Sequence, residues 1–242
     1  MPRFFVGSES ISEENIYING ADAWHIARSL RMKTGDGITV CCQNVDYECV
    51  ISRIRDEEIV LDIVSKKATE TEPDIKLTLF QAMPKSDKLD MIVQKAVELG
   101  VSEIVPVLTA RCVSRPDKKS FEKKRARLQK IAAEAAKQSG RGIIPKVGEI
   151  IKFEAYLKLT EGFDLNIMCY EGGGERLAVI DGINSCENVS LFIGSEGGLD
   201  EKEVSSAQNF GVKLATLGKR ILRCETAPLC AVSIIMSLSG NI

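Results

Sequence analysis

Three loops in the second half of the chain carry the residues whose types and spacing best suit chemistry. They are Tyr170-Glu171-Gly172-Gly173-Gly174-Glu175, Ile193-Gly194-Ser195-Glu196-Gly197-Gly198-Leu199-Asp200 and Leu217-Gly218-Lys219-Arg220-Ile221-Leu222-Arg223-Cys224-Glu225-Thr226-Ala227. Each follows an apolar run that predicts a β-strand, and glycine lets the backbone approach a ligand closely. Because open α/β sheets bind ligands at the carboxyl ends of their strands, the three loops predict a ligand site.

The sequence argues against several other chemistries. Neither Gly-x-Gly-x-x-Gly nor Gly-x-x-x-x-Gly-Lys-[Ser/Thr] occurs, so a phosphate-clamping nucleotide site is not expected. His25 is the only histidine, which disfavours Ser-His and Cys-His nucleophile systems. The eight cysteines form no Cys-x-x-Cys pair, so we expect reduced thiols and no metal site.

The secondary-structure elements that must position these loops follow two different patterns along the chain. Residues 1–70 hold short apolar runs, a helix-like stretch over 21–32 and a hairpin-like pair, 46–54 and 58–64, joined at Arg55-Asp56-Glu57. This region predicts a small β-barrel domain. Residues 74–242 alternate strands with helices, which predicts an α/β domain with a mainly parallel sheet. The expected strands are 75–82, 103–108, 165–170, 189–193 and 213–217, and the expected helices are 87–99, 120–140 (capped by Ser120), 201–210 and 226–238.

Charge is distributed unevenly along the chain. Residues 1–73 hold 8 Lys and Arg against 13 Asp and Glu, whereas residues 111–152 hold 13 against 4. Clustered cations gain free energy by displacing phosphate counterions, so the second segment favours a polyanionic partner. A solvated helix face is the alternative explanation. The longest apolar stretch, 227–238, is too short to span a bilayer, and no signal peptide is visible, so we expect a cytoplasmic protein without a membrane partner.

The second and third loops together strongly resemble the RsmE family of the knotted SPOUT methyltransferases. Other segments are similar to the family's remaining blocks: Arg3-Phe4-Phe5-Val6, His25-Ile26-Ala27-Arg28-Ser29-Leu30-Arg31-Met32, Lys95-Ala96-Val97-Glu98-Leu99-Gly100-Val101, Thr109-Ala110-Arg111-Cys112-Val113 and residues 134–145. The resemblance runs the length of the chain. It implies methylation of N3 of a uridine in small-subunit (16S) ribosomal RNA with S-adenosylmethionine as cofactor. It further implies a trefoil-knotted α/β domain, a PUA-like RNA-binding domain before it, and a homodimer.

The resemblance also implies which residues form the site. The cofactor-binding candidates are Ile193, Gly194, Glu196, Gly197, Gly198, Leu217, Gly218, Ile221, Leu222, Arg223, Thr226 and Ala227. Charge, and not the resemblance, suggests the RNA contacts, which are Arg3, Arg31, Lys33, Arg111, Lys137 and Arg141, together with the basic stretch 118–130. N3 of uracil carries a proton, so a base must remove it or a cation must stabilise the uracil anion. Arg223 and Glu225 are the catalytic candidates for these tasks; alternatively, they pair and only shape the loop.

One residue departs from the family pattern. Ser195 stands where the family has proline, in Gly-Pro-Glu-Gly-Gly. Serine lacks the fixed φ of proline, so we expect a less preorganised cofactor loop.

Three alternatives remain at this level. The first is another SPOUT RNA methyltransferase, with a different RNA or atom as acceptor. The second is a non-catalytic RNA-binding factor in ribosome assembly, which would not bind the cofactor. A nicotinamide oxidoreductase is the third, suggested only by the alternation of strands and helices.

Overall fold

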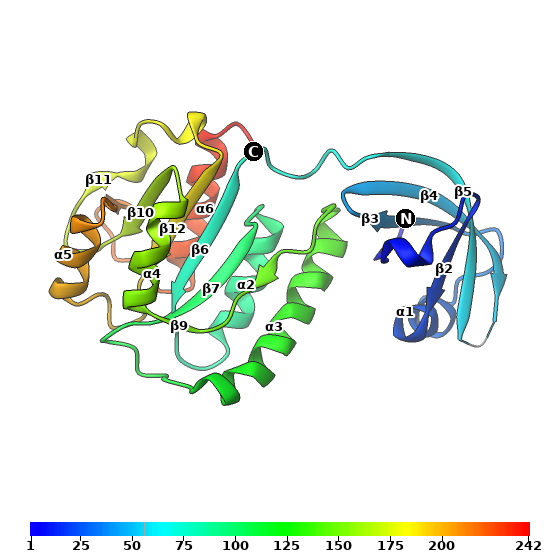
Figure 1. Cartoon of the computed structure of the whole chain (residues 1–242), viewed down its shortest axis with the longest axis horizontal. Coiled ribbons are helices and arrows are strands. Elements are labelled where there is room, and N and C mark those ends of the chain that lie inside the picture. The colour runs from blue at the N-terminus through cyan, green and yellow to red at the C-terminus, as the bar shows by residue number, and fades with distance from the viewer. Residues whose placement is uncertain (56) are drawn as a thin grey trace. The chain divides into compact units, whose positions relative to one another are not determined.

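The computed structural model describes residues 1–55 and 57–242, and the chain divides into two compact units. The first unit comprises Met1–Glu72 and Ala136–Ile143, and the second comprises Pro73–Ala135 and Ile144–Ile242. Within the described residues, no helix has the length and apolar character needed to cross a membrane. Figure 1 shows the elements of both units.

The first unit is built on a five-stranded sheet in the order β1-β3-β4-β5-β2. Its strands are β1 (Arg3–Phe5), β2 (Asn15–Asn19), β3 (Gly37–Cys42), β4 (Val45–Ile54) and β5 (Glu58–Ala68). β1 pairs with β3 in parallel, and the other pairs are antiparallel. Two register shifts in β4, at Glu48/Cys49 and Ile51/Arg53, bend the strand as β-bulges do. The predicted turn at 55–57 includes residue 56, which lies outside the described residues.

The core of this unit collects apolar side chains from the strands and one helical segment. α1 (Gly20–Trp24) continues into a π-helical turn over His25–Ser29, where one helix over 21–32 was expected. Ile26 from this turn is fully buried against Ile16, Ile38, Ile51 and Leu61. The turn is thus held by the core. It ends at Ser29, and Arg31, two residues later, has a φ of 51° in the left-handed region.

The second unit has an eight-stranded sheet in which every pairing is parallel. Its path is β11-β13-β10-β12-β6-β7-β8, and β9 also pairs with β7. The strands are β6 (Lys76–Ala82), β7 (Glu103–Leu108), β8 (Lys146–Val147), β9 (Ile151–Lys152), β10 (Leu165–Cys169), β11 (Glu175–Arg176), β12 (Asn188–Ile193) and β13 (Lys213–Thr216). The expected parallel sheet is confirmed.

Helices cover this sheet. They are α2 (Lys88–Glu98), α3 (Lys118–Ser139), α4 (Phe153–Leu159), α5 (Glu201–Asn209) and α6 (Thr226–Leu238). α2 packs against α6. The ring of Tyr156 in α4 packs at a tilt against the rings of Phe80 and Phe192 from the two central strands. α3 begins two residues before the predicted Ser120. Asp117 caps it, because its carboxylate accepts a hydrogen bond from the Ser120 backbone N–H at 2.7 Å.

Candidate functional site

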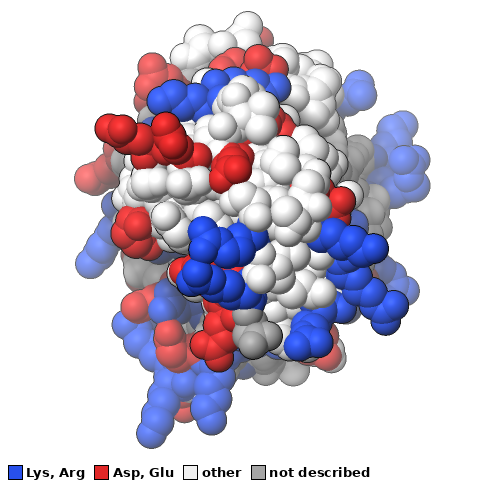
Figure 2. Space-filling view, turned by 90° about the vertical axis from the view of Figure 1, so that its right-hand side faces the viewer, with Lys and Arg blue, Asp and Glu red and all other residues white. Residues whose placement is uncertain are grey.

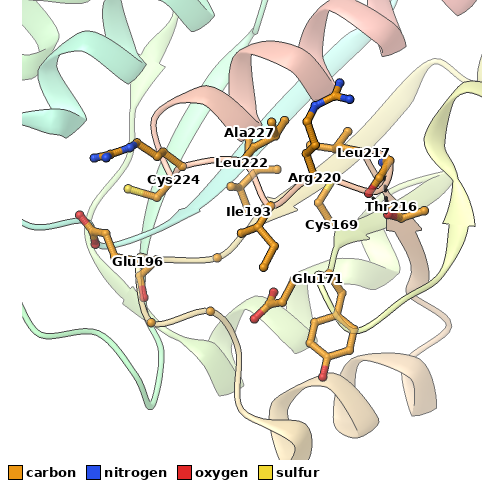
Figure 3. Close-up of a pocket in the computed structure, with 18 of the residues that line it drawn as sticks. Cys169, Glu171, Ile193, Glu196, Thr216, Leu217, Arg220, Leu222, Cys224 and Ala227 are labelled. Atoms are coloured by element: carbon orange, nitrogen blue, oxygen red, sulfur yellow. Dashed lines mark hydrogen bonds between the residues drawn. The ribbon is translucent and has the colours of Figure 1, made fainter.

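A cavity of about 540 Å³ opens at the carboxyl ends of β10, β12 and β13, three neighbouring strands of the parallel sheet. The loops that follow these strands form most of its wall, as Figure 3 shows. The lining residues are Lys88, Cys169–Glu171, Ile193–Gly198, Thr216–Cys224 and Ala227. The strand order therefore brings together three loops that are far apart in the sequence.

The structure places eleven of the twelve cofactor-binding candidates on this wall. Ile193, Leu222 and Ala227 give the centre of the cavity an apolar surface (Figure 3). Thr226 does not line the cavity, and its backbone N–H donates to the Arg223 carbonyl at 2.9 Å at the start of α6. The role of these residues in binding a cofactor stays a prediction.

The loop after β12 is held by close backbone packing. A Cβ at Gly197 would lie 2.9 Å from the Arg111 carbonyl oxygen, and Gly198 has a φ of +67°, which favours glycine. The buried amide of Gln81 donates to the Gly194 carbonyl at 3.3 Å. These contacts fix the loop from the side of the sheet.

Ser195 occupies a buried position in this loop. Its carbonyl accepts a hydrogen bond from Gly198 N–H at 3.0 Å, so the loop closes a tight turn with serine in the family's proline position. Its hydroxyl is buried and has no hydrogen-bond partner among the described residues. A buried hydroxyl without a partner carries a free-energy cost that a bound ligand could remove.

Lys88, the first residue of α2, joins the second and third loops. Its Nζ lies 3.0 Å from Glu196 Oε1 and 3.0 Å from Glu225 Oε2, and Cys224 Sγ lies 3.7 Å away. The two carboxylates raise the pKa of Lys88, and the hydrogen bond from Lys88 lowers the pKa of Glu225. Burial opposes ionisation of Glu196, but bonds from Lys88 and backbone N–H groups still hold its pKa below the ordinary value.

The two catalytic candidates have different surroundings. Arg223 lines the cavity, whereas Glu225 does not and is paired with Lys88. Cys224 Sγ also lies 3.2 Å from Glu225 Oε2 and donates to it. Burial, then this hydrogen bond, raises the pKa of the Cys224 thiol to about 12. Lys88 is therefore an ionic partner of Glu225, and the pairing with Arg223 that the sequence left open is not among the contacts of the described residues. The catalytic roles of both residues stay predictions.

Three of the expected RNA contacts are engaged inside the first unit. Arg3 donates to both carboxylate oxygens of Asp46, and Arg141 is buried and donates to both oxygens of Glu72. Lys137 lies 3.1 Å from an oxygen of Asp22 and over the ring of Phe4. These contacts give the three residues a structural part, and RNA contact at these positions stays a prediction.

The remaining RNA candidates are more accessible. Arg31 and Lys33 are exposed on the first unit. Arg111 in the second unit is exposed too, and its guanidinium reaches the Gly197 carbonyl at 3.4 Å and Asp200 at 3.7 Å. The face in Figure 2 carries Lys and Arg beside Asp and Glu. An RNA phosphate that binds a cation on this face must therefore compete with nearby carboxylates.

Sequence reasoning missed several residues of the cavity. Lys88 is the main one, and Cys169 and Thr216, just before the first and third loops, also line the wall. The sequence did contain one indication of Lys88. It lies at the start of the helix that follows β6, and the start of such a helix lies near the carboxyl edge of the sheet. Among the described residues, no group of three or more His, Cys, Asp or Glu side chains could hold a metal ion.

Comparisons with known proteins agree with one another. Residues 71–236 match the family described as RNA methyltransferase domain, and residues 18–64 match the RNA methyltransferase PUA domain. The chain is 33% identical to ribosomal RNA small subunit methyltransferase E of Bacillus subtilis (strain 168), covering 97% of this chain and 96% of the relative. It is 32% identical to the protein of the same name from Mesomycoplasma hyopneumoniae (strain 232), covering 95% and 96%.

A solved structure is also similar along its whole length. It is the crystal structure of a ribosomal RNA small subunit methyltransferase E from Neisseria gonorrhoeae bound to S-adenosyl methionine. The TM-score is 0.86 at 29% identity, and the alignment covers 98% of each chain. The likeness therefore includes both units of this chain.

Proposed function

The chain belongs to the ribosomal RNA small subunit methyltransferase E family, and we propose that it methylates N3 of a uridine in small-subunit ribosomal RNA. It is an S-adenosylmethionine-dependent methyltransferase that acts on 16S ribosomal RNA. The expected α/β domain with a parallel sheet, preceded by a PUA-like domain, is confirmed. The non-catalytic and oxidoreductase alternatives are not favoured.

The cavity at the strand ends carries this proposal, because it fits S-adenosylmethionine. Its volume of about 540 Å³ lies within the range of roughly 300–1,000 Å³ typical of small-molecule sites. Apolar side chains form its centre, and glycines leave backbone groups open to a polar ligand. We propose that Ile193, Gly194, Gly197, Leu217, Gly218 and Leu222 hold the cofactor, with Ser195 supplying an unpartnered hydroxyl beside it.

For this reaction the protein must mainly position the acceptor and stabilise the charge that develops on it. The bound cofactor supplies a methyl group on a positively charged sulfur. Holding the acceptor nitrogen in line with that methyl group supplies much of the acceleration. We propose that Arg223, a cation on the cavity wall, stabilises the uracil anion that forms when N3 gives its proton to solvent water. Glu225 does not line the cavity and is paired with Lys88, so we assign it to loop shaping.

RNA must reach the site with the target base unpaired, because N3 lies on the Watson–Crick edge. We propose that the domain over residues 1–70 docks the RNA and that the domain over 74–242 performs the transfer. Arg31, Lys33 and Arg111 are accessible cations suited to phosphate contacts. The basic start of α3, residues 118–130, offers more.

We further propose a homodimer in the cytoplasm, where ribosomal subunits are available. The support for a dimer is Ile221, which lies on the wall of the cavity yet is 86% exposed. A second copy covering this side chain would remove apolar surface from water beside the site. Light scattering measures the mass in solution, and a monomer at micromolar concentration would contradict the dimer.

The proposal is tested by titrating the purified chain with S-adenosylmethionine and then adding small-subunit or large-subunit RNA with labelled cofactor. We expect cofactor binding and label on the small-subunit RNA alone. Binding without label transfer to either RNA would contradict the proposed substrate.

A further inference from the structure

Lys88 lies at a junction of three segments that are distant in the sequence. The lysine begins α2, Glu196 belongs to the loop after β12, and Glu225 precedes α6. Both carboxylates lie 3.0 Å from the single Nζ. Figure 3 shows Glu196 and Cys224 at the same side of the cavity. One cation therefore joins the two loops that form most of the cavity wall.

The surroundings of Lys88 make its ion pairs more stabilising than an isolated pair on the surface. The exposed fractions are 30% for the Lys88 side chain, 24% for Glu196 and 17% for Glu225. An exposed pair contributes little, but two partly buried carboxylates on one cation form a network. Without Lys88, the carboxylates would face each other beside the Cys224 thiol with like charge, and the loops would separate. The backbone N–H of Lys85 also donates a hydrogen bond to Glu196. This bond holds the second loop only and does not join it to the third.

We propose that Lys88 is a positioning residue that holds the second and third loops in the cofactor-binding arrangement by pairing with Glu196 and Glu225 at once. The inference rests on the proposed function, because it assumes that these loops bind S-adenosylmethionine. Lys88 acts through the loops and their carboxylates. Its charge and its reach are both required.

The test is calorimetric titration of S-adenosylmethionine into the full chain and its variants. We expect Lys88→Met to weaken cofactor binding by about tenfold or more, and Lys88→Arg to recover much of the loss, because arginine keeps the charge. Lys146→Met is the matched control, since Lys146 forms an exposed pair with Glu103 away from the cavity. It should leave the affinity unchanged.

A double-mutant cycle separates this role from a general structural one. If Lys88 acts through Glu225, the effects of Lys88→Met and Glu225→Gln on affinity are strongly non-additive. Additive effects, or an unchanged affinity of Lys88→Met, would overturn the inference while leaving the proposed function intact. Failure of the wild-type chain to bind the cofactor would overturn both. Circular dichroism shows whether Lys88→Met folds. If it does not, Lys88→Arg and Glu225→Gln test the inference instead: the first must keep the cofactor affinity, and the second must lose it.

Discussion

The carbonyl oxygen of Arg111 lies 2.9 Å from the point where a Cβ at Gly197 would stand. The guanidinium of the same arginine reaches the Gly197 carbonyl, so the segment after β7 touches the loop on its backbone and through a side chain. Backbone cannot move aside as the end of a flexible side chain can. The loop after β12 is therefore shaped by a neighbouring segment as well as by its own sequence.

Gly197→Ala is expected to weaken S-adenosylmethionine binding. Overpacking costs about 1–3 kcal/mol, which equals roughly 5- to 150-fold if the cost falls on the bound form. Calorimetric titration measures it. Gly162→Ala is the control, because a Cβ there meets nothing within 4 Å. An unchanged affinity for Gly197→Ala would mean that the loop adapts and that this close contact does not shape the site.

Arg223→Ala is expected to reduce turnover by roughly 100-fold or more, as loss of a group that stabilises developing charge does. Cofactor affinity should change far less, because the arginine acts on the acceptor. Single-turnover methylation and cofactor titration on the same preparation measure both quantities. Equal losses in turnover and cofactor affinity would assign Arg223 to loop structure instead.

Arg3→Met is expected to destabilise the first unit by about 3–5 kcal/mol, because it leaves the Asp46 carboxylate buried without its cation. Both side chains are only 10% exposed. Urea unfolding followed by fluorescence of Trp24, the single tryptophan, reports on this unit. Arg55→Met removes an exposed pair with Glu58 and should cost less than about 1 kcal/mol. Equal costs for the two variants would contradict the structural part given to Arg3.

Acid is expected to destabilise the protein through carboxylates with lowered pKa values. Asp46 is buried, which opposes ionisation, but its bonds from Arg3 and Thr69 lower its pKa below the ordinary 3.8. Glu225 is lowered below 4.5, mainly by Lys88. A lowered pKa gives stability that is full above the ordinary value and is lost as pH falls through the lowered one. Thermal unfolding between pH 7 and pH 2 should show this loss as a falling Tm. In Asp46→Asn the Tm should fall less steeply with decreasing pH.

RNA binding is expected to weaken steeply with salt. Each phosphate contact contributes a slope of roughly 0.7–0.9 in log affinity against log salt. Removing Arg31 or Lys33 should reduce the slope by about that amount. Filter binding of small-subunit RNA at several salt concentrations measures the slope. A flat salt dependence would rule out phosphate contacts as the basis of binding.

Local pattern was enough for most of the regular elements. The apolar spacing of residues 87–99 predicted the helix found at Lys88–Glu98, and five apolar runs predicted central strands of the parallel sheet. The two-residue strands β8 and β9 carry too little pattern to be seen in a sequence. The start of α3 was placed late because Asp117, and not Ser120, caps it. A knot stays a prediction of the family resemblance, since periodicity carries no information about threading.

The site was predictable only where loops follow strands. The second and third loops were recognised because glycines and charged residues cluster in them, and the parallel sheet brings their starting points to one edge. Lys88 was missed because its partners, Glu196 and Glu225, lie more than a hundred positions away in the chain. Arg3 and Arg141 were expected to contact RNA because they are cations, yet counting charge cannot reveal that each has a carboxylate partner in the fold.

The most direct measurement uses small ribosomal subunits from a strain that lacks this enzyme. The subunits are incubated with the purified chain and labelled S-adenosylmethionine, and the modified nucleotide is mapped by mass spectrometry. We expect one methyl group at N3 of a single uridine in the small-subunit RNA, and labelling that is roughly 100-fold slower with Arg223→Ala. Label on another atom or another nucleotide type, with the wild-type protein binding the cofactor normally, would contradict this expectation.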